Sequence, residues 1–136
     1  MTQDEDQLRL LSIFHYVVGG LAGLCALFPI FHLAFGLALI FAPELFQSKG
    51  GPPPSWLGWL LVGVAAAIIV LGWIFAALVL AAGRCLAKRK LYTFCLVMGA
   101  VECLFMPFGT ILGVFTIVVL LRESAKQLFE GARDSA

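Results

Sequence analysis

Glu102 is the residue of this 136-residue chain that most needs a chemical explanation. It is the one acid inside any apolar run, in the segment from Leu91 to Arg122. A charge at the bilayer centre costs about 2.5–3.5 kcal/mol on insertion scales, so such residues face a bundle interior and usually have a partner. His32 lies in another apolar run, and counting about 1.5 Å per helical residue puts both side chains near the midplane. A His–Glu pair at that depth could relay protons, bind a cation or form a structural hydrogen bond between helices.

Thr110 is the third expected member of this intramembrane polar site. Counted away from Pro107, Gly113 falls opposite Glu102, where its missing side chain would leave room for the carboxyl group. The other histidine, His15, is expected nearer the cytoplasmic interface, in a structural role.

The chain contains no familiar motif for catalysis, cofactors or metals. A Ser/His/Asp set, a P-loop and a dinucleotide fingerprint are all missing, and GGLAGL (residues 19–24) follows no strand. The four cysteines form no CxxC motif and are expected to be small buried apolar residues: Cys25, Cys85, Cys95 and Cys103. We therefore expect no enzyme activity, no cofactor and no metal site.

The composition indicates that lipid is the solvent of this chain. It is 62% hydrophobic and 12% charged, with a mean hydropathy of +1.03, whereas soluble domains are about 45–50% apolar and about 25% charged. The net charge of +1 gives no reason to expect nucleic acid as a partner. The acidic start, MTQDEDQLRLLSIF, lacks the positive region of a signal peptide, so we expect the first apolar run to remain as a spanning helix.

These features predict an all-α integral membrane bundle of four transmembrane helices, in a single domain over residues 1–136. The helices are expected at about residues 8–42, 55–83, 90–106 and 108–122. The first is long enough for one helix kinked at Pro29 or for a hairpin of two short helices; we favour the kinked helix, because neither half would complete a span. The last two are expected to form a tight hairpin at Pro107.

Charge and glycine spacing predict topology and packing. The positive-inside rule places the basic loop 84–90 and both termini in the cytoplasm and loop 43–54 outside. The cations of this loop could also attract lipid headgroups: Arg84, Lys88, Arg89 and Lys90. Small residues that would let helices approach closely are Gly19 and Gly23, Gly109 and Gly113, each pair at GxxxG spacing, and Gly99 on the stripe of Glu102.

The stretch PFGTILGVFTIVVLLRESAKQLF (residues 107–129) resembles a motif of small bacterial membrane proteins. It has their Pro-X-Gly-Thr turn, a second glycine four residues after the first, an apolar helix ending in Leu-Leu, and a tail closing on Leu-Phe. The stretches LRLLSIFHYVVGGLAGL and RKLYTFCLVMGAVECLFMPFGT are similar to an uncharacterised branch of that group. The resemblance implies a multi-spanning protein of the bacterial inner membrane and implies no catalytic residues.

Two functions fit these expectations. The first is a non-enzymatic membrane protein that packs with itself, as a homo-oligomer, or with another membrane protein, using Glu102 and His32 as buried polar contacts. The alternative is an oligomeric proton or cation channel, or a transporter subunit, in which the same two residues carry the ion. An enzyme acting on lipid is disfavoured, because so few polar groups are present.

Overall fold

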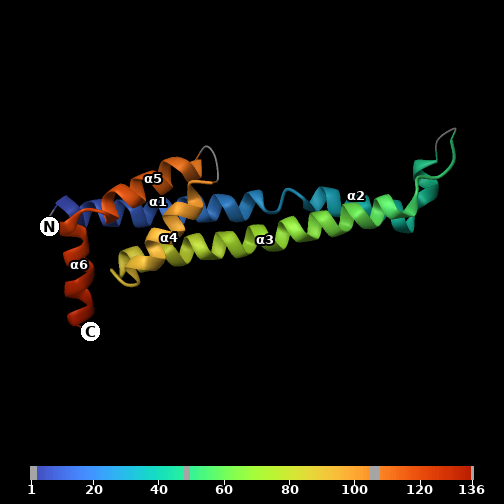
Figure 1. The fold of residues 1–136 in the computed structure, drawn as a ribbon. Coiled ribbons are helices and arrows are strands. Elements are labelled where there is room, and N and C mark those ends of the chain that lie inside the picture. Colours follow the sequence, from blue (N-terminus) through green and yellow to red (C-terminus); the bar gives the residue numbers. More distant parts are fainter. Residues whose placement is uncertain (1–2, 48–49, 105–107, 136) are drawn as a thin grey trace. The chain divides into compact units, whose positions relative to one another are not determined.

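The computed structural model describes residues 3–47, 50–104 and 108–135. The chain is all-helical, with 84% of its residues in helices. The elements are α1 (Gln3–Cys25), α2 (Ile30–Phe41), the short 3₁₀ helix η1 (Pro43–Phe46), α3 (Ser55–Ala87), α4 (Tyr92–Glu102), α5 (Phe108–Leu120) and α6 (Glu123–Asp134) (Figure 1). They form two compact units: a larger unit, Met1–Leu21 with Phe75–Ala136, and a smaller unit, Ala22–Ile74.

In the smaller unit, the end of α1 and all of α2 pack along the first part of α3. A Cβ atom built on Gly72 would lie 2.7 Å from that of Ala26, and one built on Gly58 would lie 3.1 Å from the carbonyl oxygen of Gly36. The chain from Ala26 to Gly36 therefore runs antiparallel to α3, from the level of Gly72 to the level of Gly58. The chain continues in one direction through Pro29, as expected for a single helix and not for a hairpin.

The helix is interrupted at this point rather than bent. Residues 26–29 form a turn in which the Leu27 and Phe28 amides donate to the carbonyls of Leu24 and Cys25, both at 3.0 Å. These bonds reach three residues back, as in a 3₁₀ helix, which is a common way to accommodate a proline that has no amide hydrogen.

Buried and half-buried positions on the long helices recur at alternating spacings of four and three residues, the spacing of coiled-coil seams. On α3 they are Gly58, Val62, Ala65, Ile69 and Gly72 in the smaller unit, and Ala76, Val79, Gly83 and Leu86 in the larger one. On α1 and α2 they are Leu8, Ser12, His15 and Gly19 in the larger unit, and Ala22, Ala26, Pro29, Leu33, Gly36 and Ile40 in the smaller one. Many of these residues are small, which permits the close helix contacts typical of membrane proteins.

In the larger unit, α4 and α5 form an antiparallel hairpin (Figure 1). A Cβ atom on Gly113 would lie only 2.9 Å from the amide nitrogen of Cys103, and Thr110 donates a 2.9 Å hydrogen bond to the Cys103 carbonyl. Farther along, the Tyr92 hydroxyl donates to the Leu120 carbonyl at 2.8 Å. The hairpin was expected from the sequence, although its turn at Pro107 lies outside the described residues.

The two hairpin helices are shorter than expected. They contain 11 and 13 residues, which at 1.5 Å per residue gives about 16 and about 20 Å. A transmembrane helix needs about 20 residues to cross a hydrocarbon core of about 30 Å. The predicted bounds were 90–106 and 108–122, whereas the described helices are Tyr92–Glu102 and Phe108–Leu120.

The C-terminal tail forms a separate helix, because the chain becomes extended at Arg122 (φ −69°, ψ 136°) before α6 begins. Phe129 of α6 is buried and meets the Tyr92 ring edge-on, with 5.6 Å between centroids. This contact joins α6 to a hydrophobic core that contains Leu8, Leu86 and Leu120.

The turn between α3 and α4 carries two left-handed residues that are not glycine, Arg89 (φ 53°) and Leu91 (φ 54°). The Lys90 amide donates to the Cys85 carbonyl at 2.9 Å, and the Arg89 amide to the Leu86 carbonyl at 3.2 Å. This is a Schellman cap with arginine at the position that normally holds glycine. A left-handed conformation costs roughly 1–2 kcal/mol for such a residue, and the 2.7 Å ion pair of Arg89 with Glu5 offsets part of that cost.

Two helical segments are long and apolar enough to cross a membrane. They are Gln3–Phe41, which includes the break, and Ser55–Ala87, with mean hydropathies of 2.3 and 2.8 in their most apolar windows. Only 22% and 17% of those windows are buried inside the protein. A core helix of a soluble protein would be mostly buried, so the exposure favours lipid as the surroundings of these helices.

Candidate functional site

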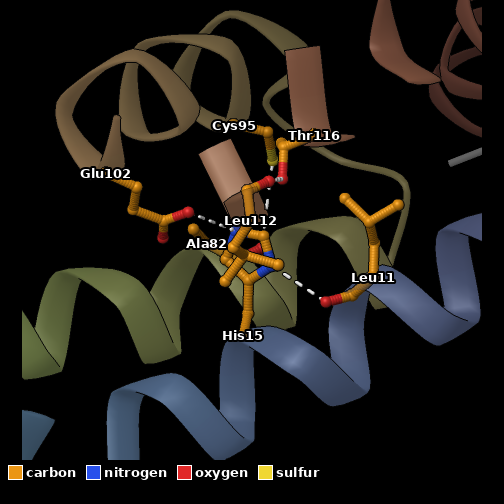
Figure 2. Close-up of polar contacts among 7 residues, drawn as sticks. All are labelled: Leu11, His15, Ala82, Cys95, Glu102, Leu112 and Thr116. Carbon is orange, nitrogen blue, oxygen red and sulfur yellow. Dashed lines mark hydrogen bonds and ion pairs between the residues drawn. The ribbon is translucent and has the colours of Figure 1, made fainter. Parts of the chain in front are cut away.

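The candidate site is a buried ion pair between His15 of α1 and Glu102 of α4, in the interior of the larger unit. Figure 2 shows the two side chains pointing toward one another from the two helices. His15 Nε2 lies 3.3 Å from Glu102 Oε2, and both side chains are 0% exposed. Ionisable groups buried in this way are usually retained for a structural or functional reason.

The second ring nitrogen of His15 determines where its proton lies. Nδ1 is 2.8 Å from the Leu11 carbonyl oxygen, as Figure 2 shows. A carbonyl only accepts hydrogen bonds, so Nδ1 carries a hydrogen and donates it. This is the usual way in which a backbone carbonyl fixes a histidine tautomer and the orientation of its ring.

Two protonation patterns would place a hydrogen between His15 Nε2 and Glu102 Oε2: an imidazolium facing a carboxylate, or a carboxylic acid facing Nε2 of a neutral imidazole. Both patterns have zero net charge.

The carboxyl group of Glu102 is not fully satisfied. Neither of its oxygens, nor Nε2 of His15, makes a hydrogen bond of good geometry with any described residue, although all three atoms are buried. Buried carboxylates normally accept several hydrogen bonds, and an unmade one costs about 1–3 kcal/mol or more. Glu102 Oε1 thus lacks a hydrogen-bond donor among the described residues.

The surrounding polar groups are satisfied separately. Ser12 donates a 2.8 Å hydrogen bond to the Gly83 carbonyl. Thr116 donates one of 2.7 Å to the Leu112 carbonyl within α5, and Figure 2 draws this second bond. Both hydroxyls are buried. Residues of α1, α3, α4 and α5 therefore meet around the pair, and none of these hydroxyls donates to Glu102.

The described contacts do not join the three predicted polar residues, Glu102, His32 and Thr110, to one another. Glu102 is buried as expected, but its partner is His15 rather than His32. His32 belongs to the smaller unit, where its side chain is exposed and lies against Phe28, with 5.9 Å between ring centroids. Thr110 donates to the Cys103 carbonyl near the end of the hairpin.

His15 was expected nearer the cytoplasmic interface in a structural role, and its side chain is completely buried in the larger unit. A signal in the sequence could have identified it, because it shares the four–three spacing of Leu8, Ser12 and Gly19, all of which are buried. Depth counting favoured His32 because it assumed two helices that cross the whole bilayer. The short α4 places Glu102 at its end, beside α1 of the same unit.

The predicted packing glycines occupy buried or half-buried positions: Gly19, Gly23, Gly99, Gly109 and Gly113. Close approaches at Gly36, Gly58, Gly72 and Gly83 were not predicted, because none of these glycines belongs to a GxxxG motif. Of the basic cluster, Arg89 is paired with Glu5, whereas the other three cations face an open cleft described below. No group of three or more potential metal ligands occurs among the residues that the structure describes.

Comparison of the chain with protein-family models, with curated proteins and with solved structures finds no match. The function must therefore be inferred from the geometry of this chain alone.

Proposed function

We propose that this chain is a non-enzymatic, multi-pass protein of the bacterial inner membrane that acts by packing with a second copy or with another membrane protein. The observation that carries the proposal is the inverted distribution of side chains. The polar pair is buried in the interior, while only 22% and 17% of the most apolar windows of the two long segments are buried inside the protein. Such a surface suits lipid and neighbouring helices.

The number of crossings follows from helix length. Four crossings, as expected from the sequence, would require α4 and α5 each to span about 30 Å with 11 and 13 residues. We propose instead that the long segments cross and that the α4–α5 hairpin enters and leaves on the cytoplasmic side. Both termini and the basic turn then stay cytoplasmic, and residues 43–54 lie outside. Buried irregular backbone at membrane depth is tolerated in such hairpins.

Cysteine labelling tests this topology in a variant whose native cysteines are replaced. We expect Gln47→Cys to react with an impermeant maleimide from outside and Ser135→Cys to react only in inverted vesicles. Leu104→Cys, two residues after the end of α4, should not react from outside, although its side chain is 80% exposed. Labelling of Leu104→Cys from outside would restore four crossings, and cytoplasmic labelling of Gln47→Cys would reverse the orientation.

Self-association is expected to use the outer face of α3. A Cβ on Gly63 would meet nothing within 4 Å, and Ala67, four residues later, is also exposed. Small residues at this spacing allow close contact between membrane helices. We expect the wild type to be a dimer or larger in nanodiscs by mass photometry and Gly63→Leu to shift it toward monomer. Gly20→Leu, at an exposed glycine of α1, is the control. A wild type that is monomeric at all concentrations, with no captured membrane partner, would contradict the proposal.

Proton transfer is the second candidate function, favoured by one specific observation. His15 Nε2 and Glu102 Oε2 lie 3.3 Å apart, and neither these two atoms nor Glu102 Oε1 makes a hydrogen bond with a described residue. A water chain reaching that oxygen would complete a proton path across an oligomer. In liposomes, Glu102→Gln should then abolish wild-type proton flux, because the amide cannot ionise. Absence of flux in the wild type, or flux that survives Glu102→Gln, rules out this candidate.

A further inference from the structure

An open cleft of about 1120 Å³ lies in the larger unit, between the end of α3, the basic turn and one face of α6. It gathers six of the nine Lys and Arg residues of the chain: Arg84, Lys88, Arg89, Lys90, Lys126 and Arg133. Glu130 is the one acid that lines it. Such a concentration of charge in a chain of net charge +1 forms a local anion-attracting surface.

The charges of this cleft are largely uncompensated. Arg89 is paired with Glu5 at 2.7 Å, but the other five cations form no ion pair with any residue described in the structure. The two walls come from different parts of the chain, with Arg84 on α3 and Lys88 in the turn directly after it, and with Lys126 and Arg133 on α6. Because the buried Phe129 fixes α6 against Tyr92, the two walls are held ready for an anion between them.

The rim of the cleft is apolar. Leu91 and Phe94 line it together with Ala81. Leu91 is 68% exposed and stands on a left-handed backbone, an arrangement that internal packing does not explain. One helical turn before Ala81, Leu78 of α3 is also exposed, so the charged cleft borders the apolar surface of the spanning helix.

We propose that this cleft binds the headgroup of an anionic phospholipid. Its phosphate lies between the cations at the end of α3 and in the basic turn and those of α6, and its acyl chains run past Leu91 along the apolar rim. A soluble anion would use the charges but not the rim, whereas a lipid uses both. The inference rests on the membrane location proposed above and adds a ligand class and a site to it.

Native mass spectrometry of the detergent-solubilised full chain, titrated with single lipids, tests the proposal. Phosphatidylglycerol should bind at least about tenfold more tightly than phosphatidylcholine with the same acyl chains. Lys126→Gln and Arg133→Gln should each weaken phosphatidylglycerol binding about fivefold, since a cation near an anionic headgroup contributes about 1 kcal/mol. These α6 residues are chosen because changing them leaves the cations that set topology intact.

The controls separate a defined site from diffuse attraction. Arg9→Gln removes an exposed cation of α1 outside the cleft and should change binding less than about twofold. The double variant Lys126→Arg with Arg133→Lys should bind as the wild type does.

Equal binding of the two lipids, or equal losses of phosphatidylglycerol binding for Arg9→Gln and Lys126→Gln, would overturn the proposal. Displacement of the lipid by excess inorganic phosphate would assign the cleft to a soluble anion instead. A chain that never enters a membrane would defeat the proposed function itself, before lipid preference is measured.

Discussion

His15→Ala is expected to lower the free energy of unfolding by about 3–5 kcal/mol, the usual cost of removing one partner of a buried ion pair. The remaining Glu102 carboxyl would be fully enclosed, with no described residue donating a hydrogen bond to it. Glu102→Ala should cost a comparable amount, since it leaves Nε2 of His15 without its partner.

Two further variants show what the pair contributes. Glu102→Gln should stay within about 1 kcal/mol of the wild type, because an amide N–H can donate to the Nε2 atom of a neutral imidazole. The double variant His15→Leu with Glu102→Leu should recover most of the stability, since apolar replacement of a complete buried pair is often neutral or stabilising.

Unfolding in mixed micelles, followed by far-ultraviolet circular dichroism, gives these free energies. The double-mutant cycle should show a coupling above about 1 kcal/mol. Additive single losses would mean that the 3.3 Å contact between His15 and Glu102 contributes nothing as a pair.

Gly113→Ala is expected to destabilise the α4–α5 hairpin by about 3 kcal/mol, at the upper end for overpacking. The new Cβ atom would lie 2.6 Å from Cys103 Sγ and 2.9 Å from the Cys103 backbone nitrogen, and it would also meet the Gly99 carbonyl oxygen. Backbone atoms cannot move aside as a flexible side chain can, so the two helices must separate. Glu102 directly precedes Cys103, and the separation should therefore also disturb its pairing with His15.

Gly20→Ala is the matched control, because a Cβ atom there meets nothing within 4 Å. It should be neutral or stabilise the chain by up to about 1 kcal/mol, the difference in helix propensity. Gly19→Ala should fall between the two, since its nearest neighbour is the end of the Leu80 side chain, at 2.9 Å. The same unfolding assay applies, and equal stability of Gly113→Ala and Gly20→Ala would contradict the close packing of the hairpin.

The helical class, the apolar segments and the α4–α5 hairpin could all be predicted from the sequence. Each depends on local properties: hydropathy, the glycines and proline near the turn, and the low polarity of the chain. Glu102 stood out for the same reason, because one acid in an apolar run is unusual whatever lies around it.

The partner of Glu102 could not be predicted, because pairing depends on helix rotation and helix length. His15 and His32 are equally plausible by type. Glu102 is the last residue of α4, an 11-residue helix about 16 Å long. This position at the end of the helix determines which histidine its carboxyl group can contact. The cleft was missed for a similar reason, since Lys126 and Arg133 lie far along the chain from Arg84 and meet it only through the docking of α6.

The break at residues 26–29 constrains the number of residues in this turn more strongly than their types. The four–three spacing of inward-facing positions passes from Ala26 through Pro29 to Leu33 without a shift, so the turn preserves the rotational phase of α1 in α2. One added or deleted residue would rotate α2 by about 100° relative to α1. Gly36 would then turn away from Gly58, and the bulkier Leu37 or Phe35 would take its place. Substitutions in this turn should therefore be tolerated more readily than any change in its number of residues.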